Sequence, residues 1–194
     1  VYDALIGEIP VEDAVVHTKY GDVLPSNKAL AGAGVELIAM DRREFLLKDA
    51  LARLKDRYDF LFIDCPPSLE LLTLNALCAA DSILVPVQGE YYALEGLSDL
   101  MNTVRIVRRS LNPQLELDGV LLTMFDGRTN LALQVAEEVK HYFPGKVYAT
   151  VIPRNVRLSE APSHGKPITA YDRTSRGAEA YTAFAAEFLK KQSA

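Results

Sequence analysis

Residues 58–64, Tyr-Asp-Phe-Leu-Phe-Ile-Asp, are followed directly by Cys65-Pro66-Pro67 and are the first of several apolar runs that indicate the fold class. An aromatic and aliphatic run that ends at turn-forming prolines is typical of a strand buried on both faces of a sheet. An acid that closes such a strand lies at the carboxyl edge, where open α/β sheets bind their ligands. Asp64 is therefore the first candidate for a functional residue.

Strands and helices are expected to alternate along the rest of the chain. Three more apolar runs predict strands at 82–88, 118–125 and 146–153, and a short run at 167–171 suggests another. Helical spacing of apolar residues predicts helices over 46–54, 71–77, 97–111, 131–139 and 181–189, with Asn130 as a cap of the fourth. Pro86 cannot donate a ladder hydrogen bond, so it is expected near the end of its strand.

Alternating elements with nearly continuous apolar strands predict an α/β fold built on a doubly wound, mostly parallel sheet. No internal repeat, low-complexity tract or linker interrupts residues 1–194, so we predict a single domain. In such a sheet, ligands bind beyond the carboxyl ends of the strands, which directs attention to residues 64–67, 88–90, 125–130 and 153–157.

Composition excludes several classes of protein. The 194 residues are 49% hydrophobic and 24% charged, which rules out a disordered tail, a collagen-like fibre and a coiled coil. No apolar run approaches the roughly 18 residues of a membrane span. Two cysteines, Cys65 and Cys78, exclude a disulfide framework and predict a reducing cytosol, and both are expected to be buried.

Charge is unevenly spread along the chain. The net charge is −5, but residues 1–103 carry −9 and residues 104–194 carry +4. The asymmetry points to a polyanion as partner of the second half, or it reflects chance variation between two solvated surfaces.

Several candidate residues lie at the strand exits, the positions that directly follow the carboxyl ends of the predicted strands. Their side chains could bind ligands or metal ions, but each also has an ordinary structural explanation. Asp64 can orient Mg²⁺ through water beside phosphates, or it can cap the next helix. Pro153 and Asn155 together stabilise a turn. Arg128 and Arg157 leave two different exits that a parallel sheet brings to one edge, and by themselves they are explained as solvated arginines.

The order of these motifs resembles one protein family along nearly the whole chain. Residues 58–69 (Tyr-Asp-Phe-Leu-Phe-Ile-Asp-Cys-Pro-Pro-Ser-Leu) are similar to the Walker B and switch segment of the ParA/Soj partitioning ATPases. The resemblance continues through Leu-Val-Pro-Val-Gln-Gly-Glu-Tyr-Tyr-Ala-Leu-Glu-Gly-Leu (84–97), Leu-Thr-Met-Phe-Asp-Gly-Arg-Thr-Asn-Leu (122–131) and Val-Ile-Pro-Arg-Asn-Val-Arg-Leu-Ser-Glu-Ala-Pro-Ser-His-Gly-Lys-Pro-Ile (151–168). It implies a P-loop NTPase-like fold.

The resemblance also implies roles for the candidate residues. Asp64 would position Mg²⁺ through water, or the switch; Pro153 and Asn155 would hold the adenine of ATP; and Arg128 and Arg157 would contact DNA phosphates without sequence preference. Further basic residues would add charge: Arg105, Arg108, Arg109, Arg154, Lys166, Arg173 and Arg176. The implied protein is cytoplasmic and nucleoid-associated, forms an ATP-dependent homodimer on double-stranded DNA, and is stimulated by a ParB-type centromere-binding protein.

One family feature is missing from the sequence. No G-x-x-x-x-G-K-[ST] motif occurs, because Gly165-Lys166 is followed by Pro167 and has no matching upstream glycine. Gly32-Ala-Gly34 is not a dinucleotide-binding fingerprint either, because the third glycine is missing. The chain resembles the family from just after switch I to its end, so we expect at least one βαβ unit, including the P-loop strand and helix, to be absent. The chain starts at Val1 without a Met, which suggests processing or a fragment. Residues 1–194 alone are expected neither to hydrolyse ATP nor to stay monomeric.

Two other functions remain open from the sequence. The chain could be a non-enzymatic remnant that binds DNA or another ParA chain. It could also be a membrane-associated positioning ATPase similar to MinD, since the last helix carries aromatic residues on one face and ends in Lys190-Lys191. The short apolar face of that helix favours docking onto the sheet instead, so no membrane partner is expected.

Overall fold

The computed structural model describes residues 1–66, 68 and 70–193, and it divides the chain into two compact units. The first unit comprises residues 1–82 and 100–116, and the second comprises residues 83–99 and 117–194. The predicted α/β fold with a parallel sheet is confirmed, whereas the single-domain assignment and the absence of the P-loop elements stay predictions. The five predicted helices all form, with small differences at their ends.

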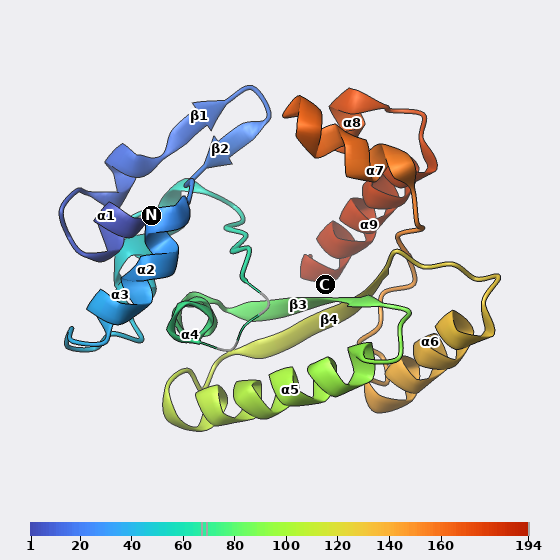
Figure 1. Ribbon diagram of the computed structural model, residues 1–194, viewed down its shortest axis with the longest axis horizontal. Coiled ribbons are helices and arrows are strands. Elements are labelled where there is room, and N and C mark those ends of the chain that lie inside the picture. Colours follow the sequence, from blue (N-terminus) through green and yellow to red (C-terminus); the bar gives the residue numbers. More distant parts are fainter. Residues whose placement is uncertain (67, 69, 194) are drawn as a thin grey trace. The chain divides into compact units, whose positions relative to one another are not determined.

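The first unit is mainly helical (Figure 1). Its elements are α1 (Tyr2–Leu5), the 3-10 helix η1 (Val11–Ala14), the antiparallel hairpin β1 (Val16–Thr18) and β2 (Gly21–Val23), α2 (Lys28–Leu37), α3 (Leu46–Leu51), the 3-10 helix η2 (Lys55–Arg57) and α4 (Leu71–Ala79). Buried Leu5 and Leu37 form its core with leucines of α3 and α4. Buried Asn75 on α4 accepts a hydrogen bond from the Leu47 amide at 3.1 Å and donates to the Arg43 carbonyl at 2.8 Å, which ties α4 to α3.

The predicted buried strand at residues 58–64 does not form, and this is the main correction to the sequence analysis. Residues 59–66 have no regular secondary structure, and Phe62 is 73% exposed. Among the described residues no strand pairs with this segment, so its backbone lacks the ladder that a strand requires. The Tyr58 hydroxyl donates to Asp22 of β2 at 2.7 Å. Pro67 and Leu69 of the same motif lie outside the described residues.

The second unit contains the parallel sheet. Its elements are β3 (Ser82–Gln88), α5 (Ala93–Ser110), β4 (Glu116–Thr123), α6 (Asn130–Tyr142), α7 (Val156–Glu160), the 3-10 helix η3 (Ala161–His164), α8 (Ile168–Tyr171) and α9 (Arg176–Gln192). The first residues of β3 and β4 and the second half of α5 belong to the first unit. Strands β3 and β4 are hydrogen-bonded neighbours.

The direction of the sheet follows from contacts at its two ends. The Glu116 amide donates to the Asp81 carbonyl at 3.1 Å, and the Thr123 hydroxyl donates to the Val87 carbonyl at 3.5 Å. Because both strands advance together between these contacts, they are parallel. Pro86 lies near the end of β3, as predicted.

The fourth predicted strand, at 146–153, forms only in part. The Val120 amide donates to the Lys146 carbonyl at 2.8 Å, and the Ile152 amide donates to the Leu122 carbonyl at 2.8 Å, so the segment follows β4 in parallel. Between these contacts the amides of Ala149 and Thr150 donate to the Glu187 carboxylate of α9, at 2.7 and 2.8 Å. The ladder is therefore interrupted because a side chain takes two of its donors.

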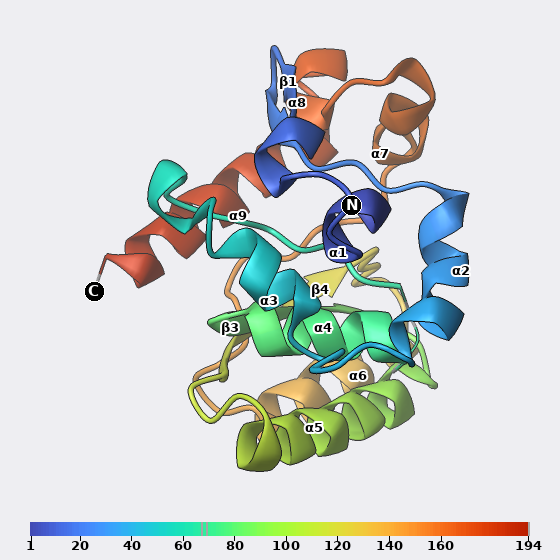
Figure 2. The same cartoon turned by 90° about the vertical axis from the view of Figure 1, so that its left-hand side faces the viewer.

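Helices cover both faces of this sheet, as a doubly wound fold requires (Figures 1 and 2). Leu121 packs with Tyr148 and Ile152 against Phe184 and Phe188 of α9. The next residue, Leu122, points to the opposite face and lines a cavity of about 510 Å³ beside α6. Adjacent residues of β4 thus face α9 and α6 in turn.

Three finer predictions are wrong. Residues 168–171 form the helical turn α8 rather than a strand, because Pro167 opens a turn in which the Tyr171 amide donates to its carbonyl at 2.9 Å. The cap of α6 is Thr129, whose hydroxyl accepts from the Ala132 amide at 3.3 Å, and not Asn130. Cys65 is exposed, since it follows the segment that forms no strand, whereas Cys78 is buried as predicted.

Candidate functional site

Two strand exits of the second unit lie side by side. The Phe125 amide donates to the Ile152 carbonyl at 3.0 Å, and the Arg154 amide donates to the Phe125 carbonyl at 3.3 Å. Phe125 and Pro153 form a parallel bridge. This pairing brings the loop that carries Arg128 next to the turn that carries Asn155, as the parallel-sheet rule predicts.

The exit of β3 lies at the start of α6. An added Cβ at Gly89 would come within 2.9 Å of the Ala132 side chain and 3.8 Å of the Phe125 ring. Only glycine allows this approach, so residues 88–90 lie against the loop that follows β4. Three of the four exits singled out from the sequence therefore share one edge, whereas residues 64–67 belong to the first unit.

Arg128 is held by an acid that the sequence analysis did not single out. Its Nε donates to Asp126 Oδ1 at 2.8 Å and its Nη2 donates to Oδ2 at 2.6 Å, a bidentate pair. The Arg128 side chain is nevertheless 88% exposed. The hydrogen bonds from Arg128 lower the pKa of the Asp126 carboxyl to about 2, and the nearby charge of Arg154 acts in the same direction. The pair is thus ionised at neutral pH.

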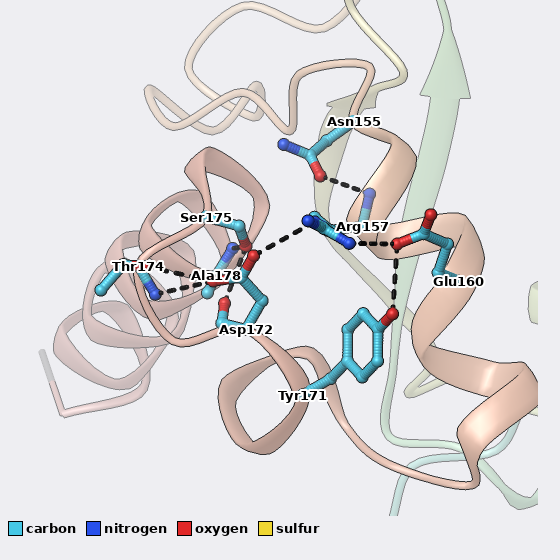
Figure 3. Close-up of polar contacts among 8 residues, drawn as sticks. All are labelled: Asn155, Arg157, Glu160, Tyr171, Asp172, Thr174, Ser175 and Ala178. Atoms are coloured by element: carbon cyan, nitrogen blue, oxygen red, sulfur yellow. Dashed lines mark hydrogen bonds and ion pairs between the residues drawn. The ribbon is translucent and has the colours of Figure 1, made fainter.

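Arg157 lies in a similar but more branched cluster, drawn in Figure 3. Its Nη1 donates to Glu160 Oε2 at 2.8 Å, and its Nε lies 3.3 Å from Asp172 Oδ2. The Tyr171 hydroxyl also donates to Glu160, at 3.2 Å. The hydrogen bond from Arg157 lowers the pKa of Glu160 and raises that of Arg157 itself. Both predicted DNA-binding arginines are therefore exposed but engaged by local carboxylates.

The local sequence contains signals that could have identified Asp126 and Glu160 as partners of the two arginines. Asp126 precedes Arg128 by two residues in an Asp-Gly-Arg turn, and Glu160 follows Arg157 by three residues on α7. Both spacings bring side chains together locally. Asp172 comes from a distant turn, so its contact with Arg157 has no signal in the local sequence.

Asn155 acts as the cap of α7. Its Oδ1 accepts from the Arg157 amide at 2.9 Å, and Figure 3 shows its amide nitrogen directed away from this bond. The turn expected from the local sequence is present, and the amide nitrogen keeps two N–H donors for a ligand. Pro153 is half-buried beside Phe125. Contact of Pro153 and Asn155 with adenine stays a prediction.

Asp64 is exposed at the end of the irregular segment in the first unit. It does not cap the next helix, because α4 begins at Leu71 with Glu70 at its N-cap position. Across the described residues, no group of three or more His, Cys, Asp or Glu side chains is arranged to hold a metal ion. One exposed carboxylate fits Mg²⁺ bound mainly by water and substrate phosphates, and it does not fit an all-protein metal cage.

The remaining basic residues of the candidate DNA surface are all exposed. They are Arg105, Arg108 and Arg109 on α5, with Arg154, Lys166, Arg173 and Arg176 in the second unit. Arg105 donates to Asn102 at 2.7 Å on its own helix. Exposure leaves these side chains accessible to anions.

The aromatic face of α9 is used for packing. Phe184 contacts the Tyr148 ring edge to face at 4.9 Å between centroids. Near the end of α9, Gln192 donates to the nearly buried Asp118 at 2.8 Å, Lys191 donates to the Asp118 carbonyl, and the Tyr148 hydroxyl donates to Asp118 at 2.5 Å. These contacts fix the helix on β4, as its short apolar face predicts. No helix among the described residues combines the length and apolarity needed to cross a bilayer.

Comparison with families and curated proteins agrees with these motifs. A family model described as an AAA domain matches residues 1–117. The chain is 60% identical over 189 residues to the sporulation initiation inhibitor protein Soj of Bacillus subtilis, covering 96% of this chain and 75% of that protein. It is 53% identical over 193 residues to the chromosome partitioning protein ParA of Myxococcus xanthus, covering 98% of this chain and 68% of the relative.

A solved structure shares the fold. The cobyrinic acid a,c-diamide synthase of Mycobacterium smegmatis, solved with ADP and magnesium, superposes with a TM-score of 0.84 at 36% sequence identity. The match covers 100% of this chain and 72% of the solved chain. The similarity supports a nucleotide-binding architecture of the P-loop NTPase type.

Proposed function

The chain belongs to the Soj/ParA family of chromosome-partitioning ATPases, and from that premise we propose that it serves in DNA segregation as an ATP- and DNA-binding partition protein. The observation that carries this proposal is the pairing of Phe125 with Pro153, because it assembles Arg128, Asn155 and Arg157 along one carboxyl edge. That edge is where sheets of this kind bind ligands.

Nucleotide binding is proposed for Asn155, Pro153 and Asp64. The free amide N–H groups of Asn155 can donate to a ring nitrogen of adenine, and Pro153 offers an apolar surface beside it. Asp64 would hold Mg²⁺ through water. Bound Mg²⁺ would supply positive charge to offset that of the triphosphate. Asn155 would orient the base without leaving its capping position.

DNA binding is proposed for Arg128 and Arg157. Guanidinium groups form bidentate contacts with phosphate oxygens, and such contacts carry no sequence information. We propose that the ATP-bound protein forms a homodimer that uses these arginines on double-stranded DNA, and that a ParB-type centromere-binding protein stimulates hydrolysis and release. The protein would accordingly be cytoplasmic and associated with the nucleoid.

Binding of a random-sequence DNA duplex, measured by fluorescence anisotropy, tests the DNA assignment. Arg128→Ala and Arg157→Ala should each weaken binding and reduce the slope of log K against log salt by about 0.9, because one phosphate contact is lost. Lys140→Ala, which removes an exposed cation on α6, is the matched control. Wild-type affinity in both arginine variants would refute the assignment.

Hydrolysis needs groups that the 194 residues do not contain. A P-loop supplies backbone N–H groups and lysines to the phosphates, and no such motif occurs in the sequence. We therefore propose that a polypeptide of residues 1–194 does not turn over ATP and does not stay monomeric. Measurable turnover by this polypeptide would contradict the first statement, and a monomer in sedimentation equilibrium would contradict the second.

The missing motif also supports a second candidate, a non-enzymatic chain that binds DNA or another ParA chain. Calorimetry with ATP separates the two, with and without an N-terminal P-loop segment joined to the chain. Binding restored by the added segment supports the ATPase, whereas no binding in either case supports the non-enzymatic chain. The membrane-associated alternative is less favoured because α9 is packed on β4; association with anionic liposomes in flotation would revive it.

A further inference from the structure

Asp126 occupies the side of Arg128 that a phosphate would use. The Nε and Nη2 donors form one edge of the guanidinium group, and both are taken by the two oxygens of one carboxylate. A phosphate presents two oxygens with similar spacing, so it would seek the same pair of donors. Phosphate and Asp126 cannot both hold this edge of Arg128.

The Asp126 carboxylate is not needed to form the turn in which it lies. The Thr129 amide and hydroxyl both bond to the Asp126 main-chain carbonyl, each at 3.1 Å. The side chain adds one contact, from the Arg128 amide to Oδ1 at 3.1 Å, which an asparagine oxygen can also accept. Its second oxygen, Oδ2, accepts a hydrogen bond from Arg128 Nη2 and takes no part in the turn. Replacement by asparagine therefore removes the charge and keeps the turn.

Arg157 shows the same arrangement with two acids. Glu160 takes its Nη1 and Asp172 lies against its Nε, so loss of either acid leaves the other in place. Asp172 is itself fixed, because its other oxygen accepts from the Thr174 amide and hydroxyl at 3.3 and 3.2 Å. Replacing one acid therefore frees the Arg157 guanidinium group less completely than it frees that of Arg128, which has a single carboxylate partner.

We propose that Asp126 competes with phosphate for the guanidinium group of Arg128 and so limits the affinity of this edge for DNA, an inference that rests on the proposed function. Glu160 acts on Arg157 in the same way and with a smaller effect. Exposed ion pairs contribute little free energy, so DNA phosphates can displace Asp126 from Arg128 and Glu160 from Arg157. Breaking each ion pair lowers the affinity of the protein for DNA. Asp126 and Glu160 thereby lower the affinity of this edge for polyanions.

The test compares Asp126→Asn, Glu160→Gln and the control Glu138→Gln, which removes an exposed carboxylate of α6, in the chain of residues 1–194. Binding to a random-sequence DNA duplex is measured by anisotropy from about 50 to about 200 mM NaCl. Asp126→Asn should tighten binding roughly threefold or more, because no carboxylate has to be displaced from Arg128, while the slope of log K against log salt stays near that of the wild type, because Arg128 contacts one phosphate in both proteins. Glu160→Gln should give a smaller gain, and the control almost none.

The double variant Asp126→Asn/Arg128→Ala decides whether the gain comes from Arg128. It should lose the gain, and a gain that persists would overturn the proposal. Unchanged binding in Asp126→Asn would also overturn it, because Asp126 would then not compete with phosphate. Weaker binding would overturn it too, because Asp126 would then orient Arg128 for DNA.

Salt elution from immobilised heparin, a sulfated polyanion, separates this inference from the proposed function. If the wild-type chain fails to bind DNA but Asp126→Asn elutes later than the wild type and Glu138→Gln, the DNA function fails and the competition stands. If the three proteins elute together, the competition fails as well.

Discussion

Residues 58–64 and strand β4 are similar in sequence and opposite in structure. Both are nearly continuous apolar runs, and both were predicted to be buried strands. Strand β4 is buried from Asp118 to Leu122 and has parallel neighbours on both sides, whereas residues 59–62 are exposed and form no strand. An apolar run becomes a buried strand only where other strands satisfy its backbone donors and acceptors.

Thiol reactivity gives the largest expected contrast. Cys65, at the end of the irregular segment, should react with Ellman's reagent at once in the folded protein, while Cys78 should react at least about a thousandfold more slowly. The contrast comes from access, because Cys78 is fully buried on α4 and Cys65 is exposed, whereas the pKa of both thiols is raised, mainly by burial. The rates are read by absorbance, with Cys65→Ser as the control that leaves only the slow thiol. Two fast thiols would contradict the burial of Cys78, and two slow thiols would contradict the exposure of Cys65.

Side-chain truncation should separate the two segments energetically. Ile152, 2% exposed beside β4, contributes to the packed core, so Ile152→Ala should lower the free energy of unfolding by about 2–5 kcal/mol. Leu61→Ala removes the same type of side chain from the exposed segment and should cost less than about 1 kcal/mol. Urea unfolding followed by circular dichroism measures both. Equal costs would show that residues 58–64 are packed in solution.

A glycine pair sharpens the account of β4. A Cβ at Gly119 would lie 2.6 Å from the Tyr148 ring and 2.8 Å from the Lys146 carbonyl, so Gly119→Ala should destabilise by about 1–3 kcal/mol. Gly96 on α5 has open space around its Cβ position, and Gly96→Ala should stabilise by up to about 1 kcal/mol. Thermal unfolding should show a lower Tm for Gly119→Ala and a higher Tm for Gly96→Ala. A neutral Gly119→Ala would mean that residues 146–148 do not lie tightly on β4.

The smallest effect concerns the acid that follows β4. Arg128 lowers the pKa of Asp126 from 3.8 to about 2 in the folded state. Because the folded value is the lower one, the stabilisation is complete above about pH 5 and is lost as the pH falls through about 2. Carbon-13 NMR of the Asp126 carboxyl should show this midpoint, and Arg128→Ala should raise it, while the amide of residue 128 still donates to Oδ1. An unchanged midpoint in the variant would disprove the ion pair.

The difference between residues 58–64 and β4 also explains which features of the structure could be predicted from the sequence. Helices α3, α4, α5, α6 and α9 followed from apolar spacing, because that signal lies within each segment. The shared edge of Arg128 and Asn155 followed from the parallel-sheet rule. The acceptor of the Ala149 and Thr150 backbone amides did not, since the Glu187 carboxylate reaches them from α9. Asp172 beside Arg157 was missed for the same reason.

The order of amino acids is enough to identify the family, the alternation of apolar runs with amphipathic segments, and the polar residues at the strand exits. The folded chain was needed to show that residues 118–122 are buried and residues 59–62 are exposed, and that carboxylates bind Arg128 and Arg157. Propensity and periodicity act between residues close along the chain. Ladder hydrogen bonds and ion pairs act through space, between groups that folding brings together.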